Sequence, residues 1–230
     1  MFAVENLSVS YPDGTNALSD VTFDLSDGEN TALIGANGVG KSSLILASVG
    51  VIKSSGKITA CGTVLTDRNL NNIRSLVGVV FQNPEDQLFT ASVYDDIAFG
   101  PRNMGLGEDE IAERIENTAK VLRIEDICRK SSLKMSGGEK RLAAIASVLV
   151  MRPSVMLFDE PTSFLDPRAR RELAALLKSL PQTKLIATHD LAFAADVCPR
   201  SIVLKEGRIF ADCATHKLLS NEDLMYQCGL

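Results

Sequence analysis

Two segments of this sequence carry side chains suited to holding and attacking a polyphosphate. The first follows the pattern G-x-x-x-x-G-K-[ST] and reads Gly35-Ala36-Asn37-Gly38-Val39-Gly40-Lys41-Ser42. In such a loop the backbone N–H groups surround an anion, the lysine reaches the β- and γ-phosphates, and the final hydroxyl binds Mg²⁺. A chance match in a chain of this length is on the order of 1%, and the glycine spacing differs from the G-x-G-x-x-G of dinucleotide-binding loops. The segment predicts a nucleoside triphosphate site.

The second segment is an acidic pair, Asp159 and Glu160, which follows the apolar run 155–158. An aspartate at the carboxyl end of a strand, beside a phosphate loop, is placed to hold Mg²⁺, often through water. We expect Glu160, on the other side of the pleat, to position and polarise the attacking water. Acidic pairs are also common in ordinary loops, so the phosphate loop upstream is what favours the catalytic interpretation.

Two further polar residues follow apolar runs. Gln82 comes after 77–81, and His189 comes after 185–188. Alone, each is more often structural than functional. Because open α/β sheets bind ligands at the carboxyl ends of their strands, we expect both side chains to face the same site as the phosphate loop.

The segment Ser136-Gly137-Gly138-Glu139 precedes a helical run. The spacing S-x-x-E is that of a capping box, in which Ser136 caps the helix and Glu139 reaches back. Two glycines inside the box also leave bare N–H groups at a positive helix end, which suits an anion. Both interpretations are open on this segment alone.

The elements that position these residues are predicted from the hydrophobic pattern. Runs 31–34, 155–158 and 184–187 are short and almost continuously apolar, which is typical of strands covered on both faces of a parallel sheet. Each is followed by a loop and then by a helical pattern, as in βαβ units. The predicted fold class is therefore α/β, with a parallel core sheet.

Other segments surround this core. Three β-like pieces predict a small antiparallel sheet near the N-terminus, at residues 2–9, 21–25 and 57–65. Residues 108–127 have the spacing of an amphipathic helix, within an inserted helical lobe at about 93–132. A hairpin is expected at 201–211. The prediction is a single compact domain over residues 1–230.

Composition excludes several classes of protein. Lys and Arg number 24 against 29 Asp and Glu, a net charge of −5, so we expect no nucleic-acid partner. The longest apolar stretch, 142–151, is about half of the roughly 20 residues that a membrane-spanning helix needs. Five scattered cysteines, with no C-x-x-C, are typical of reduced thiols.

Taken in order, these motifs resemble those of the ATP-binding cassette (ABC) ATPases, over essentially the whole chain. The resemblance implies a P-loop NTPase fold with an N-terminal antiparallel β-subdomain and an inserted α-helical subdomain. It also implies ATP and Mg²⁺ as ligands, and a second ABC ATPase subunit, identical or different. In that family two cassettes sandwich two ATP molecules, the phosphate loop of one facing the signature of the other.

The resemblance assigns roles to individual residues. Glu160 and His189 are the catalytic pair, His189 as the switch histidine at the γ-phosphate, and Asp166 is the D-loop acid. Ser42, Gln82 and Asp159 are the Mg²⁺ ligands. The signature that grips the ATP of the partner is Ser136, Gly137, Gly138 and Glu139. The expected ATP-binding residues, with Tyr11 stacked on adenine, are Tyr11, Gly35, Ala36, Asn37, Gly38, Val39, Gly40, Lys41, Ser42 and Ser43.

Three positions depart from the commonest family pattern. Met135 stands where leucine is usual, Glu139 where glutamine is usual, and Phe164 is bulky for the D-loop. We expect these to tune the site and not to inactivate it. The segment from Val79 to Phe89, followed by the segment from Asp95 to Pro101, closely resembles the energy-coupling-factor branch, whose members import cobalt, nickel or vitamins.

The leading hypothesis is the ATPase subunit of such an importer. Its membrane partner subunits would dock on the region from Gln82 to Phe89, at the cytoplasmic face of the membrane. The alternative is an ABC ATPase without transport, such as an iron–sulfur cluster assembly subunit. A DNA-repair clamp would need a long coiled-coil insertion, a translation factor a second cassette, and a sensing module the loss of Glu160. A GTPase would need an N-K-x-D motif, which the chain lacks.

Overall fold

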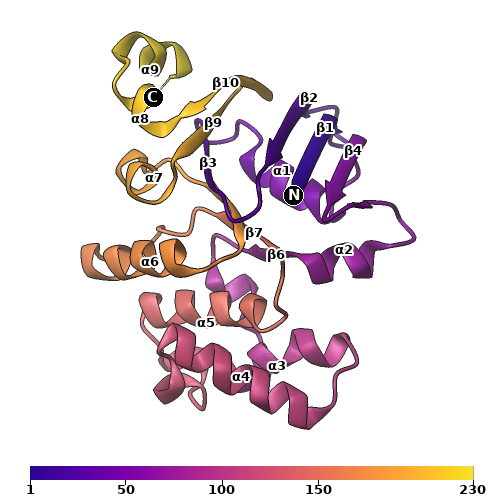
Figure 1. Cartoon of the computed structure of the whole chain (residues 1–230), viewed down its shortest axis with the longest axis vertical. Helices are drawn as coiled ribbons and strands as arrows, with labels where there is room; N and C mark the ends of the chain where they lie inside the picture. Colours follow the sequence, from indigo (N-terminus) through magenta and orange to yellow (C-terminus); the bar gives the residue numbers. More distant parts are fainter. Residues whose placement is uncertain (230) are drawn as a thin grey trace.

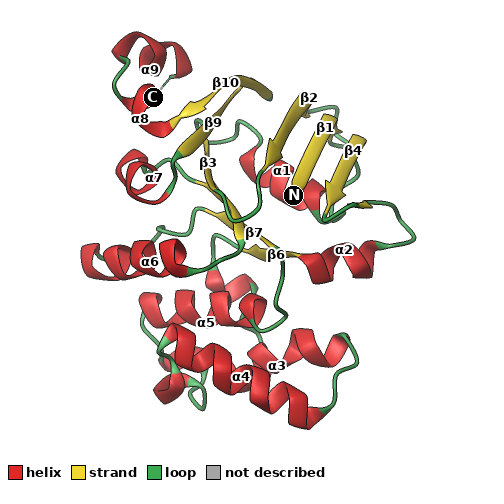
Figure 2. Cartoon of the chain, in the orientation of Figure 1, coloured by secondary structure: helices red, strands yellow, loops and turns green. Residues whose placement is uncertain are grey.

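A six-stranded sheet with the order β10-β9-β3-β8-β7-β6 forms the centre of the computed structural model, which describes residues 1–229 (Figures 1 and 2). Its members β3, β6, β7 and β8 run parallel, and β9 is parallel to β3, whereas β10 is antiparallel to β9. The strands of this sheet are β3 (Asn30–Ile34), β6 (Val77–Val80), β7 (Val155–Asp159), β8 (Thr183–Ala187), β9 (Arg200–Lys205) and β10 (Arg208–Ala214). The predicted parallel core and terminal hairpin are confirmed.

A second sheet, antiparallel and with the order β2-β1-β4-β5, lies beside α1. Its strands are β1 (Phe2–Ser10), β2 (Asn16–Leu25), β4 (Ser55–Ala60) and β5 (Thr63–Val64). The expectation of one continuous strand over 57–65 is wrong. Cys61 and Gly62 both adopt positive φ, at 48° and 79°, and two such residues form the tight turn of a hairpin. β4 and β5 are the two arms of that hairpin.

Helices cover both faces of the six-stranded sheet. The helices of the described residues are α1 (Lys41–Ser48), α2 (Leu70–Leu76), α3 (Val93–Asn103), α4 (Glu108–Leu122), α5 (Gly137–Leu149), α6 (Pro167–Ser179), α7 (Leu191–Val197), α8 (Thr215–Leu219) and α9 (Glu222–Cys228). Short 3₁₀ turns are η1 (Pro84–Asp86), η2 (Glu125–Ile127) and η3 (Ser132–Lys134). Within residues 1–229, no helix combines the length and the apolarity required to cross a membrane.

The sheet residues alternate between two hydrophobic cores. In β3, Ala32 and Ile34 pack into the core beneath α5, α6 and α7, whereas Leu33 packs with α1 and the antiparallel sheet. Both faces are therefore buried, which explains why the strand sequences are almost continuously apolar.

The helical lobe predicted at 93–132 contains α3 and α4, which pack against α5 at the end of the molecule opposite α9 (Figure 1). The expected helix over 108–127 is too long. α4 ends at Leu122 because Arg123 takes a left-handed conformation (φ 56°), and a 3₁₀ turn follows. The last residue of the predicted domain, Leu230, lies outside the described residues.

Candidate active site

The carboxyl ends of β3, β6, β7 and β8 meet at one cavity of about 390 Å³. Every residue that lines it comes from the segments singled out in the sequence, namely Asn37, Gly38, Gly40, Lys41, Ser42, Ser43, Gln82, Asp159, Glu160 and His189. The prediction that the phosphate loop, the acidic pair, Gln82 and His189 converge is thus confirmed. A volume of this size is within the range of small-molecule sites.

The glycine-rich loop between β3 and α1 depends on a left-handed turn at Gly40. Gly40 has φ 111° and is the N-cap residue of α1. A Cβ atom at this position would lie 2.5 Å from the carbonyl oxygen of Ala17, so no other residue fits. Because no side chain caps α1, its first N–H groups are available to an anion, which the positive helix end favours.

Lys41 is a buried cation beside this loop, with 6% of its surface exposed. Its Nζ donates to the carbonyl oxygens of Gly35 at 2.7 Å and Ala36 at 3.2 Å. It also lies 3.7 Å from Oε1 of Glu160. The ammonium group is therefore held between the loop backbone and the acidic pair.

The acidic pair leaves regular strand geometry at its second member. Glu160 has φ 44°, in the left-handed region, so the chain turns there and both carboxylates line the same cavity. The expectation that Glu160 lies on the other side of the pleat is wrong for this reason. Burial raises the pKa of Asp159, and the side-chain hydroxyl of Ser42 partly offsets that rise.

His189 fixes one oxygen of Glu160 and leaves the other free. Oε2 of Glu160 lies 2.8 Å from Nδ1 of His189 and accepts from the backbone N–H of His189 at 3.3 Å. Because an ionised carboxylate only accepts, Nδ1 carries the proton in this pair. Within the described residues, Oε1 is buried without a hydrogen-bond partner. Glu160 lines the cavity, and a carboxylate oxygen without a hydrogen-bond partner is suited to accepting a proton.

Gly35, Ala36 and Val39 belong to the glycine-rich loop but do not line this cavity, and three further groups of predicted residues lie outside it. The hydroxyl of Tyr11 lies 3.0 Å from that of Ser43, so its ring is next to the start of α1. Asp166 caps α6 by accepting from the N–H groups of Arg168 and Ala169. The signature residues Ser136 to Glu139 begin α5 and do not line the cavity of their own chain.

The signature forms the predicted capping box. Ser136 N–H donates to the Glu139 carboxylate at 2.8 Å, and Glu139 N–H donates to the Ser136 hydroxyl at 3.3 Å. The carboxylate of Glu139 also accepts from Lys130 at 3.0 Å. The Ser136 backbone bond and the ion pair lower the pKa of Glu139, so this extra acid is ionised and partly neutralised.

Sequence reasoning missed two side chains that bear on these residues, Lys130 and Arg141. Nothing periodic marks Lys130, which is in a loop nine positions before Glu139. The position of Arg141 could have been predicted as buried, because it precedes the buried Ile145 by four residues and the buried Val148 by seven. That spacing puts an arginine on the buried face of a helix.

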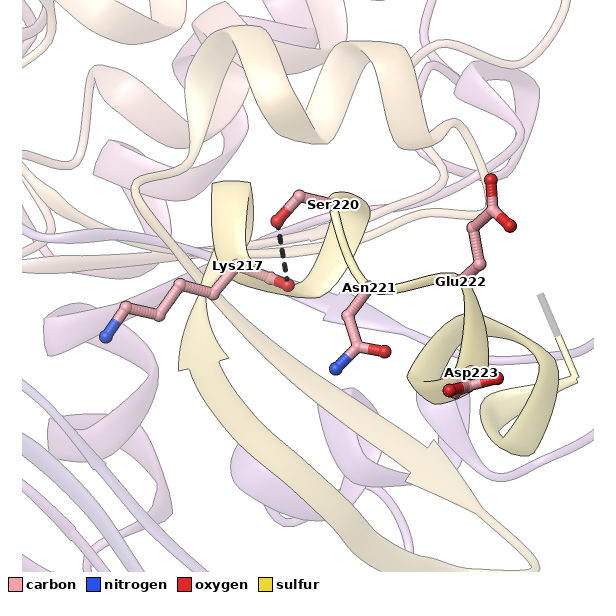
Figure 3. Close-up of a pocket in the computed structure, with 5 residues that line it drawn as sticks. All are labelled: Lys217, Ser220, Asn221, Glu222 and Asp223. Carbon is pink, nitrogen blue, oxygen red and sulfur yellow. Dashed lines mark hydrogen bonds between the residues drawn. The ribbon is translucent and has the colours of Figure 1, made fainter.

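A larger hollow, of about 600 Å³, lies at the C-terminal helices and shares no residue with the site (Figure 3). Its lining is Lys217, Ser220, Asn221, Glu222 and Asp223. Asn221 accepts from the N–H of Leu224 as the cap of α9, and Ser220 donates to the Lys217 carbonyl. These polar groups terminate helices, and the hollow is not a candidate for chemistry.

Comparison with known proteins identifies the family of this chain. The family model described as ABC transporter matches residues 18–163. The energy-coupling factor transporter ATP-binding protein EcfA of Carboxydothermus hydrogenoformans is 39% identical over 231 residues, covering 99% of this chain and 85% of that protein.

Two solved structures have the same fold. One is cbiO1 from Clostridium perfringens, described as part of the ABC transporter complex cbiONQ, with a TM-score of 0.87 and 39% identity over 98% of this chain and 93% of that one. The other is the ATP-binding cassette MJ0796, a dimer in a post-hydrolysis state bound to ADP and Pi, with a TM-score of 0.84 and 25% identity over 94% and 99% of the two chains. The chain therefore belongs to the ABC transporter family and is one of its ATPase subunits.

Proposed function

We propose that this chain powers an importer of the energy-coupling-factor type, taking up cobalt, nickel or a vitamin through membrane partner subunits at the cytoplasmic face of the membrane. The observation that carries the ATPase role is the cavity shared by Lys41, Glu160 and His189. The importer type is supported by the relatives EcfA and cbiO1, whose names place them in transporter complexes. In this proposal residues 1–230 act as one cassette, with about 93–132 as its helical subdomain.

In the proposed reaction, ATP lies with its phosphates against the loop from Gly35 to Ser43. Glu160 accepts the proton of the attacking water at Oε1, while His189 holds Oε2 and keeps the carboxylate oriented. Lys41 neutralises charge on the terminal phosphates. The Nε2 atom of His189 is not used by Glu160, and it donates to the γ-phosphate when both ring nitrogens carry a proton.

The donor set also fits Mg²⁺. Ser42, Gln82 and Asp159 line the same cavity. Their side chains offer hard oxygen donors with one carboxylate, which is what Mg²⁺ takes when it also binds phosphates. When bound, the ion neutralises charge on the β- and γ-oxygens. The raised pKa of Asp159 is the expected result of a carboxylate buried to meet a cation.

The proposed working unit has two chains. The signature Ser136 to Glu139 lies outside the cavity of its own chain, yet it presents a helix end with two glycines. It would complete the ATP site of a second ABC ATPase subunit, and the dimeric MJ0796 structure supports this arrangement. Asp166 lies near the same surface, because the segment before it approaches the signature. A Cβ atom added to Gly137 would lie 3.4 Å from the backbone oxygen of Phe164.

Lys130 compensates for the unusual glutamate of the signature. We expect Lys130→Met to weaken ATP-driven dimer formation several-fold, because the Glu139 carboxylate then faces the ATP of the partner without its neutralising ammonium. The measurement is the ATP concentration that gives half-maximal dimer in analytical ultracentrifugation. Adding Glu139→Gln to Lys130→Met should restore the wild-type value. A double variant as weak as Lys130→Met alone would contradict this role.

The membrane partner is proposed to dock on the region from Gln82 to Phe89. Phe89 and Phe99 are 63% and 47% exposed, and their rings stack edge to face at 5.0 Å. The loop is held in place by Asp96, whose Oδ1 accepts from the N–H groups of Phe89 and Thr90. An ordered, exposed aromatic pair is typical of the anchors of protein interfaces.

Co-purification tests both the docking region and the importer. With the chain expressed beside the membrane proteins encoded next to it, Phe89→Asp should reduce their recovery about tenfold or more, as expected for an anchor residue. Tyr226→Asp is the control and should change nothing, because Tyr226 is 86% exposed and its helix α9 lies at the end of the molecule opposite α3 (Figure 1). Equal effects would reject the docking region. Recovery of iron–sulfur assembly proteins in place of membrane proteins would reject the importer.

A further inference from the structure

A buried cation lies directly behind Gln82. Arg141, on α5, is 1% exposed, and its guanidinium donates to the backbone carbonyl oxygens of Phe81 at 2.7 Å and of Gln82 at 2.6 Å. Burial lowers the pKa of Arg141 to about 10, and no neighbouring charge contributes to this shift. The arginine therefore satisfies carbonyl groups and not a carboxylate.

Two more side chains attach the same segment to α5. Gln87 accepts from the N–H of Phe81 at 3.3 Å and donates to the carbonyl oxygen of Ala144 and the hydroxyl of Ser147 at 2.8 and 2.9 Å. Lys140 forms an ion pair with Glu85. Residues 81–87 are thus held to α5 by three side chains, Arg141, Gln87 and Lys140. Of these, Arg141 is fully buried and is the one that bonds to Gln82 itself.

A purely structural role does not explain this choice of residue well. A guanidinium without a carboxylate partner is costly to bury, and an apolar side chain of similar volume commonly stabilises such a position. What the guanidinium adds is a planar fork that fixes two consecutive carbonyl groups in direction. The direction of the Gln82 backbone determines where its side chain enters the cavity.

α5 carries the anchor of Gln82 and also the signature. Ser136 caps the helix and Arg141 is in its first turns, so the distance between the two is set by rigid helical backbone. Gln82 lines the cavity of its own chain, whereas the signature lies outside it. One helix therefore connects two places at which nucleotide is proposed to bind.

We propose that Arg141 is a positioning residue, which fixes Gln82 in the nucleotide cavity. The inference rests on the proposed function, because it assigns Gln82 to the magnesium–ATP complex.

The test compares two buried cations. Arg141→Met and Arg141→Lys are made together with Lys184→Met, a control at the amino end of β8, an interior strand of the sheet. The ammonium of Lys184 is also fully buried and donates to Asn30, Leu180 and Gln182. All variants carry Glu160→Gln so that ATP is not consumed. Calorimetry gives the ATP affinity with Mg²⁺ and with EDTA, and hydrogen exchange follows the amides of Phe81 and Gln87.

Arg141→Met is expected to reduce the gain in ATP affinity that Mg²⁺ provides by about 10- to 100-fold, the usual cost of losing a group that orients a metal ligand. Its affinity in EDTA should stay within about twofold of the parent, because the phosphate loop is untouched. Arg141→Lys should retain part of the gain in affinity, since a lysine ammonium replaces only part of the two-carbonyl contact that the guanidinium makes. Exchange at Phe81 and Gln87 should accelerate in both, but not in Lys184→Met.

Equal Mg²⁺ gains in the Arg141 variants and in the control would overturn the proposal and leave the proposed function intact. Faster hydrogen exchange at the amides of Phe81 and Gln87 in Lys184→Met would also overturn the proposal. If Arg141→Met fails to fold, Arg141→Lys tests the proposal by the same two measurements, the gain in ATP affinity with Mg²⁺ and the hydrogen exchange at Phe81 and Gln87. Absence of ATP binding in the Glu160→Gln parent would instead reject the proposed function.

Discussion

Replacing Glu160 by glutamine should lower the rate of ATP hydrolysis by about 10²- to 10⁴-fold, the usual contribution of a positioned general base. The amide keeps the shape of the side chain and its contact with His189, but it cannot accept a proton at the position of Oε1. ATP binding should persist, because the phosphate loop and Lys41 are unchanged. Gel filtration with ATP should then show an accumulated dimer.

A matched variant separates this effect from a general loss of charge. Glu116→Gln removes an exposed carboxylate that pairs with Lys120 on α4, and its hydrolysis rate should equal that of the wild type. If Glu160→Gln binds nucleotide but forms no dimer, the two-chain arrangement is wrong for this protein. If it hydrolyses ATP at the wild-type rate, Glu160 is not the base.

Lys41→Met should lower the affinity for ATP on the order of 10²-fold or more. Hydrogen bonds to charged groups contribute about 1.5–3 kcal/mol each, Lys41 is placed for both the β- and the γ-phosphate, and tenfold in affinity corresponds to about 1.4 kcal/mol. Burial strengthens the effect, because the ammonium is 6% exposed and water cannot replace it. Equilibrium binding of a fluorescent ATP analogue measures the loss.

The control for this variant is Lys57→Met, which removes an exposed lysine paired with Glu5 at 2.8 Å. Its affinity for ATP should be unchanged. Thermal unfolding of Lys41→Met checks that the loop is still folded. A folded Lys41→Met protein that binds ATP as tightly as Lys57→Met would show that the phosphates lie elsewhere.

Much of the fold could be predicted because its strands are short, apolar and buried on both faces. The runs at 31–34, 155–158 and 184–187 needed no tertiary information, since both of their faces had to be covered. The hairpin at Cys61 and Gly62 was missed because one of its two left-handed residues is not a glycine, and propensity disfavours such a residue at that position.

The site could be predicted as a set of residues but not as a geometry. The left-handed conformation of Glu160 places both carboxylates in one cavity, and no local pattern marks a glutamate for that conformation. The signature posed a choice between a helix cap and an anion site. In the structure the Ser136 hydroxyl accepts the capping bond, which leaves its own proton for a phosphate oxygen, so the two roles are compatible.

The order of strands in the central sheet has a consequence for synthesis of the protein. β3, which leads into the phosphate loop, has β8 and β9 as its neighbours, and β8 begins at Thr183, about 150 residues after β3 ends at Ile34. At about 5–20 residues per second, a ribosome needs roughly 8 to 30 seconds to supply them. The antiparallel sheet, complete by Val64, can close in the meantime. A nascent chain thus carries the whole phosphate loop, with the apolar strand β3 unpaired, long before β8 and β9 emerge to hold that loop in place.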